Sequence, residues 1–116
     1  MNLQECYQAL GGDYEAVLGR LRSERMITRF VLKFLEDKSC EQLREAVADK
    51  RGEEAFRAAH TIKGICQNLS FDRLYQSSNA LAECLRGGWD DAAIALTEPV
   101  VADYQVTVEA IRQLDT

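Results

Sequence analysis

Apolar residues recur at three- and four-residue spacing along nearly the whole chain, which predicts helices, and no segment alternates like a strand. We expect helices over residues 2–10, 13–20, 23–50, 53–69, 70–86, 89–96 and 97–114. Because the turns between them are short, consecutive helices should be antiparallel. The pattern therefore predicts a single all-α domain over residues 1–116, an up-down four-helix bundle with short N-terminal helices.

Two boundaries in this prediction depend on individual residues. Ser39 and Gln42 match a capping box, but no glycine or proline reverses the chain there, so residues 23–50 should form one helix, kinked near Lys38. That helix carries a strong apolar stripe, which includes Phe30, and Phe30→Ala should cost about 3–5 kcal/mol if that ring is fully buried. Pro99 should not lie deep inside a helix, so the last helix is expected to begin at Thr97, with Pro99 in its first turn.

The helix over residues 53–69 carries the candidate chemistry. Its apolar stripe consists of Ala55, Ala58, Ala59, Ile62, Ile65, Cys66 and Leu69. His60, the only histidine in the chain, lies about 160° from Ile62, on the outward face. Gly64 follows one turn later, and Lys63 is at the flank. A mid-helix glycine costs about 1 kcal/mol relative to alanine, so Gly64 suggests that something needs clearance beside His60. The alternative is a surface histidine with a chance glycine next to it.

This stretch is similar to the signature of histidine-containing phosphotransfer (HPt) domains. The segment His60-Thr61-Ile62-Lys63-Gly64, followed by Asn68-Leu69, resembles the family pattern His-x-Leu-Lys-Gly, which has a further glycine some residues later. The runs 10–13, 34–37 and 55–59 also resemble the family, in the same order, so the similarity covers nearly the whole chain. Ile62 replaces the usual leucine, and Ser70 stands where the later glycine is common, which leaves the turn geometry open.

The resemblance implies that His60 takes a phosphoryl group from an aspartyl-phosphate on a receiver domain and passes it to another receiver. Lys63 would pair with the phosphoryl charge, and Gly64 would leave room for the receiver. A rim of Phe56, Arg57, Gln67 and Phe71 would dock the receiver. The other interpretation makes Phe56 and Phe71 edge-of-core residues and Arg57 a solvated helix charge.

The imidazole also needs orienting, and the next helix offers two candidates. If the two helices are antiparallel about a turn near residue 70, residues ten before and ten after the turn meet. This nominates Asn79 or Glu83 as the hydrogen-bond partner of His60. Alternatively, each is only a solvated polar residue.

Charge and composition narrow the function classes. The 14 basic and 19 acidic residues give a net charge of -5, which argues against nucleic acid as the main partner. There is neither an apolar span for a membrane nor a signal peptide, so we expect a cytoplasmic monomer, and the ends at Met1 and Thr116 favour a stand-alone protein. Cys6, Cys40, Cys66 and Cys84 are scattered and should be reduced; a four-cysteine metal site is possible, but their spacing does not favour it.

The sequence has no Gly-rich nucleotide loop and no Lys-Ser/Thr phosphate cradle, so we expect a carrier and not a kinase or other enzyme. It also lacks the acidic cluster of a receiver, so no cofactor is expected and the Mg²⁺ for transfer should belong to the partner receiver. Two other functions remain open. One is a helical interaction module that binds a receiver or kinase partner without being phosphorylated. The other is a hydrolase or metal enzyme that uses His60, which a lone histidine disfavours.

Overall fold

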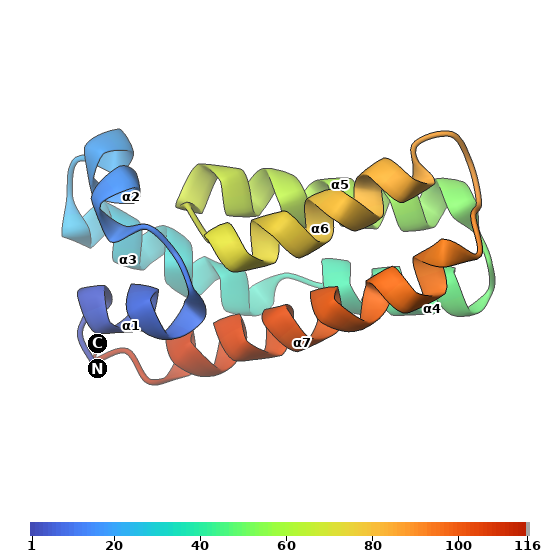
Figure 1. The fold of residues 1–116 in the computed structure, drawn as a ribbon. Helices are drawn as coiled ribbons and strands as arrows, with labels where there is room; N and C mark the ends of the chain where they lie inside the picture. The colour runs from blue at the N-terminus through green and yellow to red at the C-terminus, as the bar shows by residue number, and fades with distance from the viewer. Residues whose placement is uncertain (116) are drawn as a thin grey trace.

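The computed structural model describes residues 1–115. Within them the chain forms helices and no strands, which confirms the predicted all-α class. Figure 1 shows the elements in order: α1 (Leu3–Leu10), α2 (Tyr14–Leu21), α3 (Glu24–Lys33), the 3-10 helix η1 (Phe34–Glu36), α4 (Ser39–Ala48), α5 (Gly52–Leu69), α6 (Asp72–Leu85) and α7 (Ala92–Arg112). No helix among residues 1–115 is both long enough and apolar enough to cross a bilayer.

The four helices α4 to α7 form the long body of the molecule. α5 packs against α4 and α6, and α7 packs against α6 and α4, so each has two neighbours in a closed order. Consecutive members run in opposite directions (Figure 1). The helices α1, α2 and α3 cover one end, where the termini meet: the Met1 ammonium group lies 3.0 Å from a carboxylate oxygen of Asp115. The site helix α5 is thus held from both sides along its length.

The single helix predicted over residues 23–50 is wrong, because the chain breaks at Asp37. α3 ends at Lys33, and α4 begins at Ser39 after the η1 turn. The Asp37 carboxylate accepts hydrogen bonds from the backbone N–H of Ser39 at 3.1 Å and from its hydroxyl at 2.7 Å. It also accepts a 2.5 Å hydrogen bond from the Tyr104 hydroxyl on α7. The N-cap residue Lys38 makes no side-chain cap, so the start of the new helix is held by the Asp37 side chain through Ser39, and not by a glycine or proline.

The Phe30 ring is not fully buried, so the condition for a large cost of Phe30→Ala is not met. Phe30 is 41% exposed and Met26 40% exposed, whereas Ile27 and Val31 on the same helix are fully buried. The main contacts of α3 are with α2, η1 and α5, so its broad apolar stripe is covered on one side and open on the other.

The helix break predicted before Pro99 is absent as well, since α7 runs without interruption from Ala92 to Arg112 with Pro99 inside it. Pro99 and Ala95, whose carbonyl loses its helical N–H donor, both lie on the exposed face of α7. Water can hydrogen bond to that carbonyl, which keeps the cost of the proline low enough for the packed face of α7 to hold the helix together.

The turn between α5 and α6 settles the question that Ser70 raised. Ser70 adopts the left-handed conformation (φ 58°, ψ 42°) that glycine usually takes at a helix end. Arg20 on α2 donates to the carbonyl of Asn68 at 2.6 Å and to the Ser70 hydroxyl at 3.0 Å. The buried Tyr7 hydroxyl on α1 donates to the carbonyl of Leu69 at 2.8 Å. Side chains of the N-terminal helices therefore hold this turn in place of a glycine.

Candidate functional site

His60 lies in the middle of α5 with its side chain exposed. Its orientation is fixed by the opposite face of the helix, whose buried residues are Ala55, Ala58, Ala59, Ile62, Cys66 and Leu69. Because these small and medium side chains pack into the core, α5 cannot rotate without exposing them. The outward position that helical geometry predicts for His60 is therefore the position it has.

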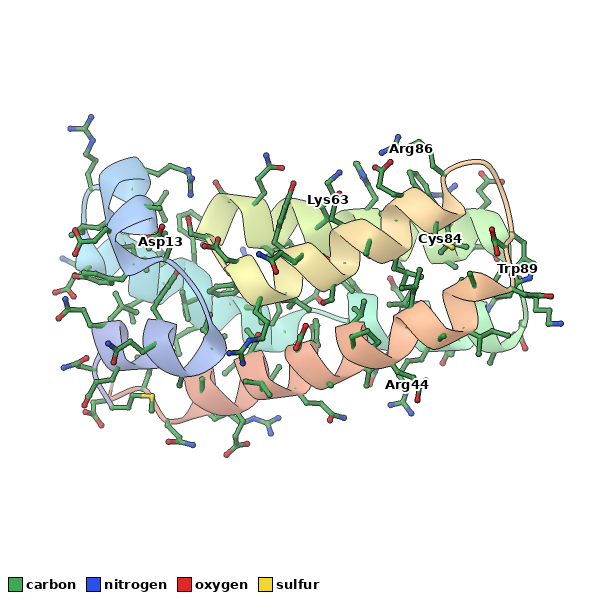
Figure 2. All side chains as sticks on the ribbon, viewed as in Figure 1. Asp13, Arg44, Lys63, Cys84, Arg86 and Trp89 are labelled. Atoms are coloured by element: carbon green, nitrogen blue, oxygen red, sulfur yellow. The ribbon has the colours of Figure 1, made fainter. Side chains whose placement is uncertain are left out.

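Gly64 lies one turn beyond His60 and faces open space. A Cβ atom added at Gly64 would meet no other heavy atom within 4 Å, so no packing contact inside this protein requires a glycine there. Lys63, beside it, is half-buried. Figure 2 places Lys63 and Arg86 on the same outer side of the α5–α6 pair. The surface around His60 therefore combines a bare stretch of backbone with cationic side chains.

The closest partner of the His60 ring is aromatic. The Phe56 ring, one turn earlier on α5, stacks on the imidazole with 5.6 Å between centroids and 22° between planes. Phe56 is half-buried. The guanidinium carbon of Arg86, which follows the last residue of α6, lies 5.5 Å from the centroid of the Phe56 ring. The two helices are thus joined at the site by a histidine, a phenylalanine and an arginine.

Glu83 does not form the hydrogen bond to His60 for which the sequence made it a candidate. Its carboxylate accepts from Arg86 Nη2 at 2.7 Å and from Arg86 Nε at 3.3 Å. The hydrogen bond and positive charge of Arg86 lower the pKa of Glu83, and the charge of Lys63 adds a smaller lowering. Asn79, the other candidate, is half-buried and makes no hydrogen bond to the imidazole either. Among the side chains of residues 1–115, none hydrogen bonds to His60, and of the two candidates on α6 Glu83 is bonded to Arg86 instead.

Of the four predicted rim residues, Phe71 is buried and cannot contact a partner. The left-handed turn at Ser70 directs the Phe71 ring into the core, where its centroid lies 5.6 Å from that of Tyr7 and 5.4 Å from that of Phe34. The alternative interpretation of Phe71 as a core residue is the correct one.

The other three rim residues, Phe56, Arg57 and Gln67, remain at the surface around His60. Arg57 forms an exposed ion pair with Glu53, with 3.0 Å between Nη2 and Oε1. Because these three side chains are accessible, they could contact a partner, and their docking role stays a prediction.

Sequence reasoning missed Arg86 altogether. It lies far from the His60 motif along the chain, and no short pattern connects the two. The contact between Phe56 and His60 did leave a signal, since residues four apart on a helix are neighbours on its surface. That spacing is enough to place Phe56 beside His60, whereas on the sequence alone the ring is considered only as a docking or edge-of-core residue.

The cysteines do not form part of the site. Burial raises the pKa of the Cys6 thiol to about 11 and raises that of Cys66 further above its ordinary range. No group of three or more histidine, cysteine, aspartate or glutamate side chains in residues 1–115 lies close enough together to hold a metal ion. The chemistry available at the site is therefore that of one imidazole with a lysine and an arginine nearby.

The family model of the Hpt domain matches residues 31–115. The chain belongs to the Hpt domain family. Hpt domains act in histidine phosphotransfer within phosphorelay signalling, where they work with receiver domains as carriers and not as kinases. The match includes all of α5 and α6, with His60, Lys63, Gly64 and Arg86, and leaves α1 and α2 outside it. No curated protein and no solved structure matches the chain.

Proposed function

We propose that this protein is a phosphoryl carrier in which His60 takes a phosphoryl group from an aspartyl-phosphate of one receiver domain and gives it to the aspartate of another. The observation that carries the proposal is the exposed His60 of an Hpt-family chain, with open space at Gly64 one turn away. A donor that is a whole folded domain needs that open approach. A histidine buried in the bundle could not serve it.

The transfer is a displacement at phosphorus. A ring nitrogen of neutral His60 attacks, the bond between phosphorus and the donor's aspartyl oxygen breaks, and the donor aspartate leaves as a carboxylate. The proton on the other ring nitrogen can pass to water once the ring is phosphorylated. The return transfer reverses these steps on the second receiver. We assign the Mg²⁺ for both transfers to the receivers, because they would supply the acidic ligands.

Lys63 and Gly64 support different parts of this process. The phosphorylated imidazole carries close to two negative charges, and the Lys63 ammonium group, one turn along the same helix, can pair with them. Gly64 keeps the backbone bare where the receiver's active-site rim would approach. Phe56, Arg57 and Gln67 surround these residues and would contact the receiver, with Arg57 exchanging its ion pair with Glu53 for one with the acidic pocket.

The direct test uses a receiver domain phosphorylated with labelled phosphate. Incubation with the protein should produce acid-labile phosphate on His60, and the His60→Gln variant should gain none. If several receivers dock but none transfers the label, the protein is an interaction module that binds receivers without being phosphorylated. That outcome would overturn the carrier function.

A further inference from the structure

The imidazole of His60 has no hydrogen bond from any side chain in residues 1–115, yet an attacking nitrogen must point at the phosphorus. The torsion that turns a histidine ring about its last bond has broad energy wells, so an exposed, unbonded ring would sample many planes. For the ring to be oriented before a receiver docks, a contact other than a side-chain hydrogen bond has to limit its rotation. The stacked Phe56 ring is the contact in place to do so.

We propose that Phe56 and Arg86 are positioning residues that fix the plane of the His60 imidazole. Phe56 presents a flat face to the histidine ring at 5.6 Å and 22°, a geometry that is lost if the imidazole turns about its bond to Cβ. Phe56 is itself half-buried, so its ring is held by its own packing against the bundle. The stack therefore offers His60 one favoured plane.

Arg86 extends the arrangement to α6. Its guanidinium carbon lies 5.5 Å from the Phe56 centroid, within the range in which a cation is attracted to an aromatic face. The guanidinium plane is fixed by the two hydrogen bonds that Arg86 donates to the Glu83 carboxylate. Glu83 thus acts on the histidine through Arg86 and Phe56. The sequence had suggested a direct hydrogen bond from Glu83 to His60 instead.

The ion pair of Arg86 and Glu83 also affects the charge next to the phosphoryl site. Glu83 is hydrogen bonded to Arg86, and the charge of Arg86 and, less strongly, that of Lys63 lower its pKa. A carboxylate that is already hydrogen bonded to Arg86 competes less with a phosphoryl group for Lys63. Removing Arg86 would therefore loosen the Phe56 ring and also leave Glu83 as a rival partner for Lys63.

The positioning role rests on the proposed function, because a fixed ring plane matters only if His60 attacks phosphorus. The test of the positioning role needs no receiver. Phosphoramidate can serve as the donor: its P–N bond breaks, a ring nitrogen of His60 bonds to phosphorus, and ammonia leaves. A small donor removes any contribution of Phe56 or Arg86 to docking. His60 is the only histidine, so its ring protons give unambiguous NMR signals.

The variants are Phe56→Leu, which keeps apolar bulk but loses the flat face, and Phe56→Tyr, which keeps both. We expect Phe56→Leu to lower the maximal rate constant for labelling of His60 by phosphoramidate about two- to tenfold, with little change in the phosphoramidate concentration that gives half of the maximal rate, and Phe56→Tyr to restore it. The His60 ring protons should be shifted upfield in the wild type and in Phe56→Tyr, and should move toward the position of an unstructured histidine in Phe56→Leu. Arg86→Ala should move both readouts in the same direction by a smaller amount.

Two matched controls come from other parts of the molecule. Phe30→Leu makes the same substitution at an exposed phenylalanine on α3, and Arg44→Ala removes an exposed arginine on α4, well away from Lys63 (Figure 2). Neither should move the ring-proton shifts or the rate constant. Circular dichroism of each variant establishes that the helices remain.

The outcomes separate the two proposals. If folded Phe56→Leu keeps the wild-type ring-proton shifts and rate constant, the positioning role is overturned and the carrier function stands. If phosphoramidate fails to label even the wild type, the ring-proton shifts of the same variants decide whether Phe56 fixes the ring plane, and the assay with a phosphorylated receiver decides the carrier function.

Discussion

The Tyr104 hydroxyl on α7 donates a 2.5 Å hydrogen bond to the Asp37 carboxylate at the break between α3 and α4. Asp37 also caps α4 through Ser39, so one carboxylate determines where α4 starts and how that start is tied to α7. Since α4 packs against α5, this contact helps to hold the helix that carries His60.

Removing this hydroxyl should cost measurable stability. We expect Tyr104→Phe to lower the free energy of unfolding by about 1.5–3 kcal/mol, the range for a hydrogen bond to a charged group, while the aromatic contact with Phe34 remains. Urea unfolding followed by circular dichroism measures this. A loss below about 0.5 kcal/mol would show that Asp37 is satisfied by Ser39 and water alone.

Stability should fall in alkaline solution for a defined reason. Burial raises the pKa of Tyr7, and burial with the Asp37 hydrogen bond raises the pKa of Tyr104. A raised pKa in the folded state means that the stabilising contribution is complete below the unfolded-state value of about 10 and is lost as pH rises above it. Each tyrosine can contribute a slope of up to about 1.4 kcal/mol per pH unit there.

Comparison of the wild type with Tyr7→Phe and Tyr104→Phe isolates this effect, because the buried cysteines, which also titrate in alkaline solution, are the same in all three proteins. Urea unfolding between about pH 9 and 11 should give a shallower decline in each variant than in the wild type. Equal slopes in the three proteins would mean that neither phenol contributes.

His60→Gln should abolish phosphorylation and leave the fold unchanged. The side chain is exposed and makes no hydrogen bond within the described residues, so the free energy of unfolding should change by less than about 0.5 kcal/mol. Denaturant unfolding and a labelling assay on the same sample check both parts. A large loss of stability would mean that the imidazole is structural.

Gly64 allows a test of the clearance that the carrier function requires. Gly64→Ala should stabilise the protein by up to about 1 kcal/mol, because its Cβ would meet open space and alanine favours the helix. Gly64→Arg should slow transfer from a phosphorylated receiver but leave labelling by phosphoramidate close to the wild-type rate. Transfer from the receiver at the wild-type rate in Gly64→Arg would remove the clearance argument.

Features that depend on one helix alone could be predicted from the sequence, and features that depend on contacts between helices could not. The outward position of His60 followed from the periodicity of residues 53–69 alone. The break at Asp37 could not be predicted in this way, because part of what holds it is Tyr104, which is distant along the chain. The burial of Phe71 depends on the conformation of Ser70, and that conformation is held by Arg20.

The contact of Arg86 with Phe56 shows the same limit at the site itself. Helical spacing brings Phe56 next to His60, but it takes the packing of α6 on α5 to place an arginine against that ring. The sequence motif around His60 carries no information about which side chains the neighbouring helix brings to the site. Such partners become visible only when the two helices are seen together.

The most direct measurement of the central claim is a relay with two receivers, in which labelled phosphate starts on the aspartate of the donor. The carrier function predicts that the label appears first on His60 and then on the acceptor, and that the His60→Gln protein passes none. Label that reaches the acceptor equally well through His60→Gln, or that never appears on His60 while the donor binds, would contradict it.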